Sequence, residues 1–387
     1  MKIGIDKIGF YTPNKYVDMV DLAMARNVDP NKYLKGIGQE KMSVADISQD
    51  AVSMAINATK QYLPKIDIDK VGLLIVGTES SVDESKSASL FVKSALKLKA
   101  SVRTFEIKEA CFGLTAAIFT AYDYISTHAD KTAIVIGSDI ARYGLNTAGE
   151  VTQGAGSISL LIKKDPAMLS INPQTSAYSK DINDFWRPTG SATALVDGKY
   201  STQVYLDFFE YTFKNYQKQN NVNISNFKAL LYHLPFTKMG LKANNLAIAN
   251  LAERDAKKLT NEFKNSIELS KQVGNIYTGS LYLGLLSLLV HAELKLNDLI
   301  GLFSYGSGAM AEFFTFNIEA GYRNEIIDPY LILNRRKRLT VAEYEKIFTE
   351  SLQAPIDGQS LVSDEQAGMW YFAGTKNHIR QYCEKNR

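Results

Sequence analysis

The chain has 387 residues, a length typical of two domains or of two fused halves. Hydrophobic residues make up 45% and charged residues 22%, which excludes disordered, collagenous and coiled-coil proteins. The net charge of +3 is too close to balance to indicate nucleic-acid binding, which needs a concentrated basic face. The two cysteines, Cys111 and Cys383, are too few for a disulfide framework or a cysteine zinc cluster.

The N-terminal segment differs from a secretion signal. Lys2, Asp6 and Lys7 interrupt its apolar residues, whereas a signal peptide needs an unbroken apolar stretch. The most apolar run of the chain, residues 281–290, contains Ser287 and is only half of the roughly 20 residues that a membrane span needs. We therefore expect a cytoplasmic protein without membrane contact, in which this run forms a buried helix.

Short, continuously apolar runs predict strands that are buried on both faces. The runs are residues 71–77, 133–137, 158–162, 229–232 and 299–305. Helical patterns cover residues 46–62 and 110–125, and Thr340-Val-Ala-Glu343 is a capping box that marks a further helix start. Strands that alternate with helices predict an α/β fold with largely buried sheets.

The two halves of the chain carry the same series of features: a strand end, a helix start, and a strand followed by glycine. The series is Glu79, Cys111 and Gly137 in the first half, and His233, Asn275 and Gly306 in the second. This repetition predicts two related α/β halves, residues 1–165 and 166–387. Since open α/β sheets bind ligands beyond the carboxyl ends of their strands, we expect these strand ends to converge on one site.

Cys111 has two interpretations. A lone cysteine in apolar surroundings is most often part of the core. Here charged Lys108 and Glu109 precede it and Gly113 follows, which predicts a change from strand to helix at this point. A thiol at a helix N-terminus has its pKa lowered by the free N–H groups and the helix dipole, and the same N–H groups can hold an oxyanion. We expect Cys111 to be a nucleophile with a lowered pKa.

His233 and Glu79 both follow apolar strands. His233 precedes Pro235, which stops regular pairing and lets a functional side chain project. Glu79 has two open interpretations: it caps the next helix, or it is an acid/base group whose pKa is raised by burial.

Two glycine-containing segments resemble nucleotide-binding loops only in part. Residues 306–311 fit G-x-G-x-x-A, but a dinucleotide fingerprint follows the first strand of a complete mononucleotide-binding unit, and too little chain remains after it. Residues 154–156 lack the third glycine. We expect both segments to be tight turns that supply backbone N–H groups. The basic run 335–338 is expected to be a solvated approach to the helix that Thr340 begins, and Cys383 is given no role.

Seven segments in the same order along the chain resemble one family, the 3-hydroxy-3-methylglutaryl-CoA (HMG-CoA) synthases, and its bacterial members in particular. They are residues 28–39, 76–79, 109–113 (Glu-Ala-Cys-Phe-Gly), 196–201, 233–238, 274–278 (Gly-Asn-Ile-Tyr-Thr) and 303–308. The resemblance runs nearly end to end. It implies a thiolase-like fold of two duplicated α/β halves with buried mixed sheets, usually as a homodimer, and no metal or other cofactor.

The resemblance implies the condensation of acetyl-CoA with acetoacetyl-CoA and water to HMG-CoA and CoA, in the mevalonate route to isoprenoids. Cys111 would be the nucleophile that takes the acetyl group, Glu79 the general acid/base, and His233 the group that acts on the acetoacetyl carbonyl. Residues expected near the acyl group are Tyr143, Thr152, Ser201, Asn275 and Ser307. Residues expected to contact CoA are Asp29, Pro30, Lys32, Lys238 and Lys242. Phe112 stands where eukaryotic members often have Tyr, and we expect little effect from this difference.

The chemistry of the reaction agrees with these roles. Carbon–carbon bond formation needs a carbanion next to a thioester, and an acetyl group on Cys111 remains a thioester with acidic α-protons. Glu79 would remove a methyl proton, while backbone N–H groups at Cys111 and near Ser307 would hold the enolate oxygen.

Three alternatives to this function stay open. An initiating β-ketoacyl-carrier-protein synthase or a thiolase would have cysteine with histidine and asparagine, or a second catalytic cysteine. Neither accounts for Glu79, and Cys383 lies in the wrong place for a thiolase. A non-catalytic acyl-CoA-binding paralogue would be expected to have lost Cys111 and its polar partners.

Overall fold

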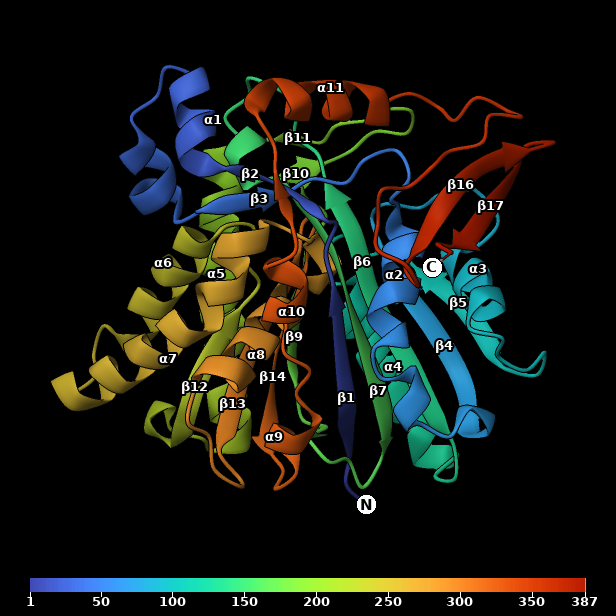
Figure 1. Ribbon diagram of the computed structural model, residues 1–387. Helices are drawn as coiled ribbons and strands as arrows, with labels where there is room; N and C mark the ends of the chain where they lie inside the picture. The colour runs from blue at the N-terminus through green and yellow to red at the C-terminus, as the bar shows by residue number, and fades with distance from the viewer. Residues whose placement is uncertain (387) are drawn as a thin grey trace.

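A ten-stranded mixed sheet forms the centre of the molecule in the computed structural model, which describes residues 1–386 (Figure 1). Its order is β12-β13-β14-β8-β1-β7-β6-β4-β5, with β9 paired to β14. The strands of the first half are β1 (Ile3–Tyr11), β4 (Val71–Gly77), β5 (Arg103–Ile107), β6 (Thr132–Ala141) and β7 (Gly154–Lys164). Those of the second half are β8 (Leu169–Ile171), β9 (Ser176–Ser179), β12 (Phe227–Tyr232), β13 (Leu299–Gly306) and β14 (Met310–Ile318).

The same pairing pattern occurs on each side of the sheet. β4 pairs parallel with β6, which pairs antiparallel with β7, and β7 pairs antiparallel with β1. In the second half β12, β13, β14 and β8 repeat this series of one parallel and two antiparallel pairs. The two sets meet where β1 pairs with β8 through only two residue pairs, Gly4↔Ser170 and Ile5↔Leu169. The predicted α/β fold with mixed sheets is confirmed, while the division at residues 165/166 stays a prediction.

Two apolar helices, α4 (Gly113–Thr127) and α8 (Ser280–His291), bury their side chains in one large core with residues of β1, β4, β7, β13 and β14. Residues 281–289 of α8 are all buried, which confirms the predicted buried helix. No helix within residues 1–386 is both long and apolar enough to span a membrane.

The outer helices cover the two halves of the sheet separately (Figure 1). α2 (Ala51–Lys60) and α3 (Ala88–Ala95) pack on the strands of the first half. α5 (Gly198–Asn220), α6 (Thr237–Ile248) and α7 (Glu253–Val273) pack on those of the second, where aromatic side chains of α5 fill a second core with β12, β13 and β14.

Smaller elements gather beyond one end of the sheet, at the top of Figure 1. They are α1 (Met19–Ala25), the π-helix η1 (Lys32–Ile37), the small sheet of β2 (Lys15–Asp18), β3 (Lys41–Ser43) and β15 (Lys337–Arg338), the hairpin β10 (Phe185–Trp186) and β11 (Leu195–Val196), and α11 (Val341–Ser351). The Thr340 capping box of α11 is confirmed, because Thr340 Oγ1 accepts the Glu343 N–H and the Glu343 carboxylate accepts the Thr340 N–H. The C-terminal hairpin of β16 (Trp370–Lys376) and β17 (Ile379–Glu384) lies beside α2 and α3.

The remaining elements are short connections. They are α9 (Tyr322–Glu325), α10 (Tyr330–Leu333) and the 3-10 turns η2 (Leu63–Lys65), η3 (Ile68–Lys70), η4 (Glu150–Thr152), η5 (Ile224–Asn226) and η6 (Tyr277–Gly279).

One of the two predicted glycine turns is confirmed and the other is wrong. After Gly306 the chain turns directly into β14, and no helix follows, so this segment is not a dinucleotide loop. Residues 154–156 instead begin β7. Gly154 is required there because a Cβ would lie 2.6 Å from the Asn275 carbonyl oxygen.

The prediction of a solvated basic run at residues 335–338 is wrong for Arg336. Its guanidinium is buried and donates hydrogen bonds to Ser43 Oγ and to the Gln272 carbonyl. The reason is that β15 pairs with β2, which draws this segment onto the small sheet.

Candidate active site

A cavity of about 260 Å³ opens between the two halves, where several strands end. It brings together seven of the residues that the sequence predicts at a site. They are Cys111, Tyr143, Thr152, Ser201, His233, Asn275 and Ser307. The predicted convergence of strand ends from both halves is therefore present in the structure.

Cys111 and Glu79 are in direct contact at this cavity. Glu79 lies two residues beyond the end of β4, and Cys111 lies two residues before the start of α4. The Cys111 Sγ atom donates a hydrogen bond to Glu79 Oε1 at 2.9 Å. Glu79 does not cap the next helix, since Ser87 caps α3. Of the two interpretations of Glu79, the structure thus favours the acid/base group.

The pKa of Cys111 is raised well above its usual value, mainly by burial and also by the carboxylates of Glu79 and Asp139. The prediction of a lowered pKa is wrong. The helix begins at Gly113, after Cys111, and among residues 1–386 no cation contributes to the pKa shift of the thiol. Desolvation and the negative neighbours therefore outweigh the effect of the helix terminus on this pKa.

The pKa of Glu79 is raised, to about 8, chiefly because the carboxyl group is buried and then because Asp139 lies nearby. Two groups lower the pKa of Glu79: the Cys111 thiol and the Arg187 guanidinium. The guanidinium also donates a hydrogen bond to the Glu79 carbonyl. Glu79 can therefore hold or release a proton close to neutral pH, as an acid/base group must.

Asp139 positions Glu79 and was not assigned a role from the sequence. It is fully buried at 0% exposure, near the end of β6. Its Oδ1 accepts the Glu79 N–H at 2.7 Å and the hydroxyls of Thr78 and Ser80 at 2.9 Å each. The sequence offered one indication of this role: Asp139 comes shortly after the apolar run 133–137, as Glu79 comes shortly after the run 71–77.

His233 directly follows β12 and is 2% exposed. Its N–H donates to the Phe303 carbonyl at 2.8 Å and its own carbonyl accepts the Tyr205 hydroxyl at 2.8 Å, so the backbone is fixed on both sides. Burial lowers the imidazole pKa to about 3. At neutral pH the ring is uncharged and carries one N–H group.

Asn275 and Tyr143 form one wall of the cavity. Asn275 Nδ2 donates to the Tyr143 hydroxyl at 3.3 Å, while its Oδ1 accepts from the Tyr277 N–H and the Ser280 hydroxyl at 2.8 Å each. The Tyr143 ring also meets Phe185 and Tyr277 edge to face.

Ser201 and the turn that carries Ser307 are joined by a second buried carboxylate, Asp184. It accepts hydrogen bonds from the Tyr305 hydroxyl (2.6 Å), the Gly308 N–H (3.0 Å) and the Ser201 hydroxyl (3.1 Å). No sequence pattern marked Asp184, which is one polar residue in a polar loop.

The predicted CoA contacts lie outside the cavity lining. Asp29, Pro30 and Lys32 precede or begin η1, whereas Lys238 and Lys242 are on α6. These two elements touch, because the Thr237 hydroxyl donates to the Gly38 carbonyl at 2.6 Å. Ile37 of η1 and Met239 of α6 do line the cavity, so the lysines stand at its outer side.

Within the described part of the chain, no group of three or more His, Cys, Asp or Glu side chains is arranged to hold a metal ion. The expectation of no metal and no other cofactor stays a prediction.

A mixed α/β fold built from two repeated units, with a cysteine beside a glutamate and a histidine at their junction, defines the class of thiolase-like acyl-condensing transferases. Residues 1–167 match the family model for the hydroxymethylglutaryl-coenzyme A synthase N terminal, and residues 242–383 match the one for the C terminal. The chain belongs to the hydroxymethylglutaryl-CoA synthase family, which confirms the resemblance seen in the sequence.

Relatives and solved structures agree with this assignment. The hydroxymethylglutaryl-CoA synthase of Enterococcus faecalis is 44% identical over 99% of this chain and 100% of its own. An HMG-CoA synthase crystallised with CoA superposes with a TM-score of 0.94 at 42% identity, covering 99% of this chain and 100% of that one. MvaS in complex with 3-hydroxy-3-methylglutaryl coenzyme A gives a TM-score of 0.92 at 35% identity, and the match covers 100% of this chain and 99% of that one.

Proposed function

We propose that this chain condenses acetyl-CoA with acetoacetyl-CoA and water to HMG-CoA and CoA, in the mevalonate route, with Cys111, Glu79 and His233 as its catalytic residues. The observation that carries the proposal is the 2.9 Å contact between Cys111 Sγ and Glu79 Oε1 at a cavity that His233 also lines. Family membership and the similarity to a structure that contains HMG-CoA support the choice of substrates.

In the first step the Cys111 sulfur attacks the carbonyl carbon of acetyl-CoA. The thiol proton passes to Glu79, which already accepts its hydrogen bond. The bond between carbonyl and CoA sulfur then breaks, and the CoA thiolate leaves with that proton. A carboxyl group with a raised pKa suits both transfers, because neither protonation state is strongly favoured near neutral pH.

In the second step Glu79 removes a methyl proton from acetyl-Cys111, and the resulting enolate carbon attacks the ketone of acetoacetyl-CoA. Because His233 is neutral, we assign it a hydrogen bond from its ring N–H to the ketone oxygen rather than the donation of a proton. The proton held by Glu79 then passes to the new alkoxide. Water finally hydrolyses the thioester, releasing HMG-CoA and restoring the Cys111 thiol.

Mass spectrometry after exposure to acetyl-CoA, followed by addition of acetoacetyl-CoA and chromatography of the products, tests the proposal. We expect an acetyl adduct on Cys111 and then HMG-CoA. Cys111→Ser abolishes turnover. Glu79→Ala still accepts the acetyl group, because loss of the carboxylate lowers the thiol pKa, but more slowly than wild type because the thiol proton has lost its acceptor; it slows condensation by roughly 10²–10⁴-fold.

Other outcomes identify the alternatives. Formation of the adduct without HMG-CoA indicates another condensing enzyme of this fold, and an unmodified Cys111 indicates a non-catalytic acyl-CoA-binding protein. Near-normal condensation by Glu79→Ala contradicts the role given to that residue.

We further propose that the protein is a homodimer. The edge strand β5 pairs only with β4 in residues 1–386, which leaves its outer N–H and C=O groups available to a second copy. Half-buried Phe105 and Ile107 lie on this strand. Sedimentation velocity is expected to give twice the chain mass of 43.0 kDa, whereas a single 43.0 kDa species contradicts the dimer.

A further inference from the structure

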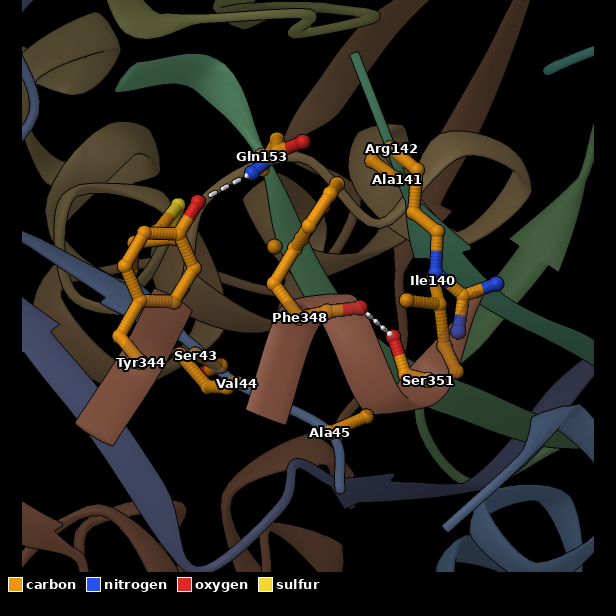
Figure 2. A pocket seen from close by; sticks show the side chains of 12 residues that line it. Ser43, Val44, Ala45, Ile140, Ala141, Arg142, Gln153, Tyr344, Phe348 and Ser351 are labelled. Atoms are coloured by element: carbon orange, nitrogen blue, oxygen red, sulfur yellow. Dashed lines mark hydrogen bonds between the residues drawn. The ribbon is translucent and has the colours of Figure 1, made fainter. Parts of the chain in front are cut away.

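The cavity wall that carries Tyr143 and Thr152 is the segment from residue 143 to residue 153, and helix α11 lies behind it. Figure 2 shows this contact: Gln153, directly before β7, and Tyr344, on α11, point toward each other and share a hydrogen bond. α11 is about 200 residues away along the chain and contributes no residue to the lining of the 260 Å³ cavity.

The Gln153 side chain connects α11 to the backbone of Tyr143. Its Oε1 accepts the N–H groups of Tyr143 at 2.7 Å and of Gly144 at 3.1 Å. Its Nε2 donates to the Tyr344 hydroxyl at 2.8 Å. Gln153 is 3% exposed and Tyr344 is 1% exposed, so water cannot readily replace these partners.

A second polar bridge ties the same segment to α11. Glu150 accepts two hydrogen bonds from the Arg26 guanidinium, at 2.7 and 2.8 Å, and one from the Asn146 N–H at 3.0 Å. Arg26 also pairs with Glu345 of α11 at 2.7 Å. Backbone N–H groups at the beginning of the segment are thus held by the side chains of Gln153 and Glu150 at its end. Those two side chains are held in turn by Tyr344 and Arg26, which lie outside the segment.

The position of Tyr143 is sensitive to this support. Its hydroxyl is 3.3 Å from Asn275 Nδ2, so an outward displacement of a few tenths of an ångström breaks the hydrogen bond. The segment has little regular structure of its own, since Gly144 and Asn146 both have positive φ and only the short turn η4 follows. Within residues 1–386, Gln153 is the acceptor that the structure gives to the Tyr143 N–H.

We propose that Gln153, supported by Tyr344 of α11, is a positioning residue that holds Tyr143 against Asn275 in the active-site cavity. This inference rests on the proposed condensation, for which Tyr143 and Asn275 line the acyl pocket. Neither Gln153 nor Tyr344 touches substrate, so both act through Tyr143.

A double-mutant cycle tests the proposal. Gln153→Met keeps the length of the side chain but removes both polar functions, and we expect kcat/KM to fall about tenfold or more. In a Tyr143→Ala background the same substitution should lower kcat/KM less than about twofold, because the side chain that Gln153 positions is no longer present. Gln153→Glu retains acceptors for both N–H groups but loses the donor to the Tyr344 hydroxyl and adds a buried charge near Glu150, so its kcat/KM should lie between those of Gln153→Met and wild type. The kcat/KM of Tyr344→Phe should lie between those of wild type and Gln153→Met.

The matched control is Gln61→Met. Gln61 also bridges backbone groups, with its amide bonded to the N–H and carbonyl of Phe10, but it lies at the end of α2, away from the cavity. The Gln61→Met variant should have a lower melting temperature than wild type, as Gln153→Met should, but an unchanged kcat/KM. Equal losses for Gln153→Met in both backgrounds, or no loss at all, overturn the positioning role.

A wild-type protein that forms no HMG-CoA contradicts the proposed function and not this inference. In that case the crystal structure of the Gln153→Met variant tests whether Gln153 positions Tyr143. A Tyr143 hydroxyl displaced from Asn275 supports the positioning role, and an unchanged hydroxyl position overturns it.

Discussion

The carboxyl group of Glu79 lies between a thiol that donates to it and a second carboxylate that raises its pKa. The sequence predicted Glu79, Cys111 and His233 at one site, because each stands where a buried strand ends or a helix begins. It could not predict the direction of the Cys111 pKa shift, which depends on desolvation of the sulfur at the cavity and on the negative neighbours Glu79 and Asp139. Asp184 was missed for the same reason, since its three donors come from distant parts of the chain.

Asp139→Asn should change the pH dependence of condensation. Glu79 removes a proton only as a carboxylate, so the rate rises with pH through the pKa of Glu79, which burial and Asp139 both raise. Without the Asp139 charge that pKa falls, and the acid limb of the profile should move to lower pH. The measurement is the condensation rate of pre-acetylated enzyme as a function of pH. An acid limb that stays in place would show that Asp139 does not act on Glu79 electrostatically.

At the scale of elements, the apolar runs predicted five strands of the large sheet, because a strand buried on both faces is apolar throughout; these are β4, β6, β7, β12 and β13. Residues 71–77 coincide with β4, and residues 299–305 lie within β13. The strands β1, β5 and β14 were not predicted, because charged residues interrupt their apolar pattern. The short strands β8 and β9 were not predicted either, since three or four residues carry too little pattern and their pairing depends on β14. The start of β7 was mistaken for a turn, because its glycines serve close packing against residues 273–275 rather than a change of direction.

Gly306→Ala should displace Cys111, the proposed nucleophile, through the end of β13. A Cβ at this position would lie 2.8 Å from the Glu109 carbonyl oxygen and 2.9 Å from the Phe112 nitrogen, and backbone atoms cannot easily yield. We expect a loss of about 1–3 kcal/mol in the free energy of unfolding and a fall of more than about tenfold in kcat. Urea unfolding and steady-state kinetics measure the two effects.

The control for this variant is Gly284→Ala in α8, where the nearest atom to a new Cβ is at 3.4 Å and alanine favours the helix. It should leave both quantities nearly unchanged. A Gly306→Ala enzyme with wild-type kcat would show that the end of β13 does not fix the Cys111 segment.

At the scale of the whole molecule, the cavity is assembled from both halves, while the proposed CoA contacts lie in or just before η1 of the first half and on α6 of the second. The internal repetition predicted two related halves. It did not predict that they share one continuous sheet, since the β1–β8 pairing involves only two residue pairs and leaves no mark on the sequence.

Removing the charges of Lys32, Lys238 and Lys242 together should weaken substrate binding without affecting the chemical steps. CoA carries several phosphate charges, and within residues 1–386 none of these lysines forms an ion pair with a carboxylate. If each exposed contact contributes about 0.2–1 kcal/mol, the triple alanine variant should raise the KM for acetyl-CoA several-fold and leave kcat unchanged. Added salt should raise the wild-type KM and have less effect on the variant.

Lys257→Ala, which removes an exposed lysine of α7, is the matched control and should change neither constant. A lower kcat with an unchanged KM in the triple variant would place these lysines outside the CoA contacts.

The narrow join between β1 and β8 has a consequence for synthesis on the ribosome. β1 emerges well before its neighbours β7 and β8, which are made only after about 150 further residues. A nascent chain that stops near residue 165 can complete the β7 side of β1 but leaves the other side of that strand bare. Such an uncovered backbone edge is a template for intermolecular aggregation, so we expect fragments that end before β8 to require chaperones that a chain including β8 does not.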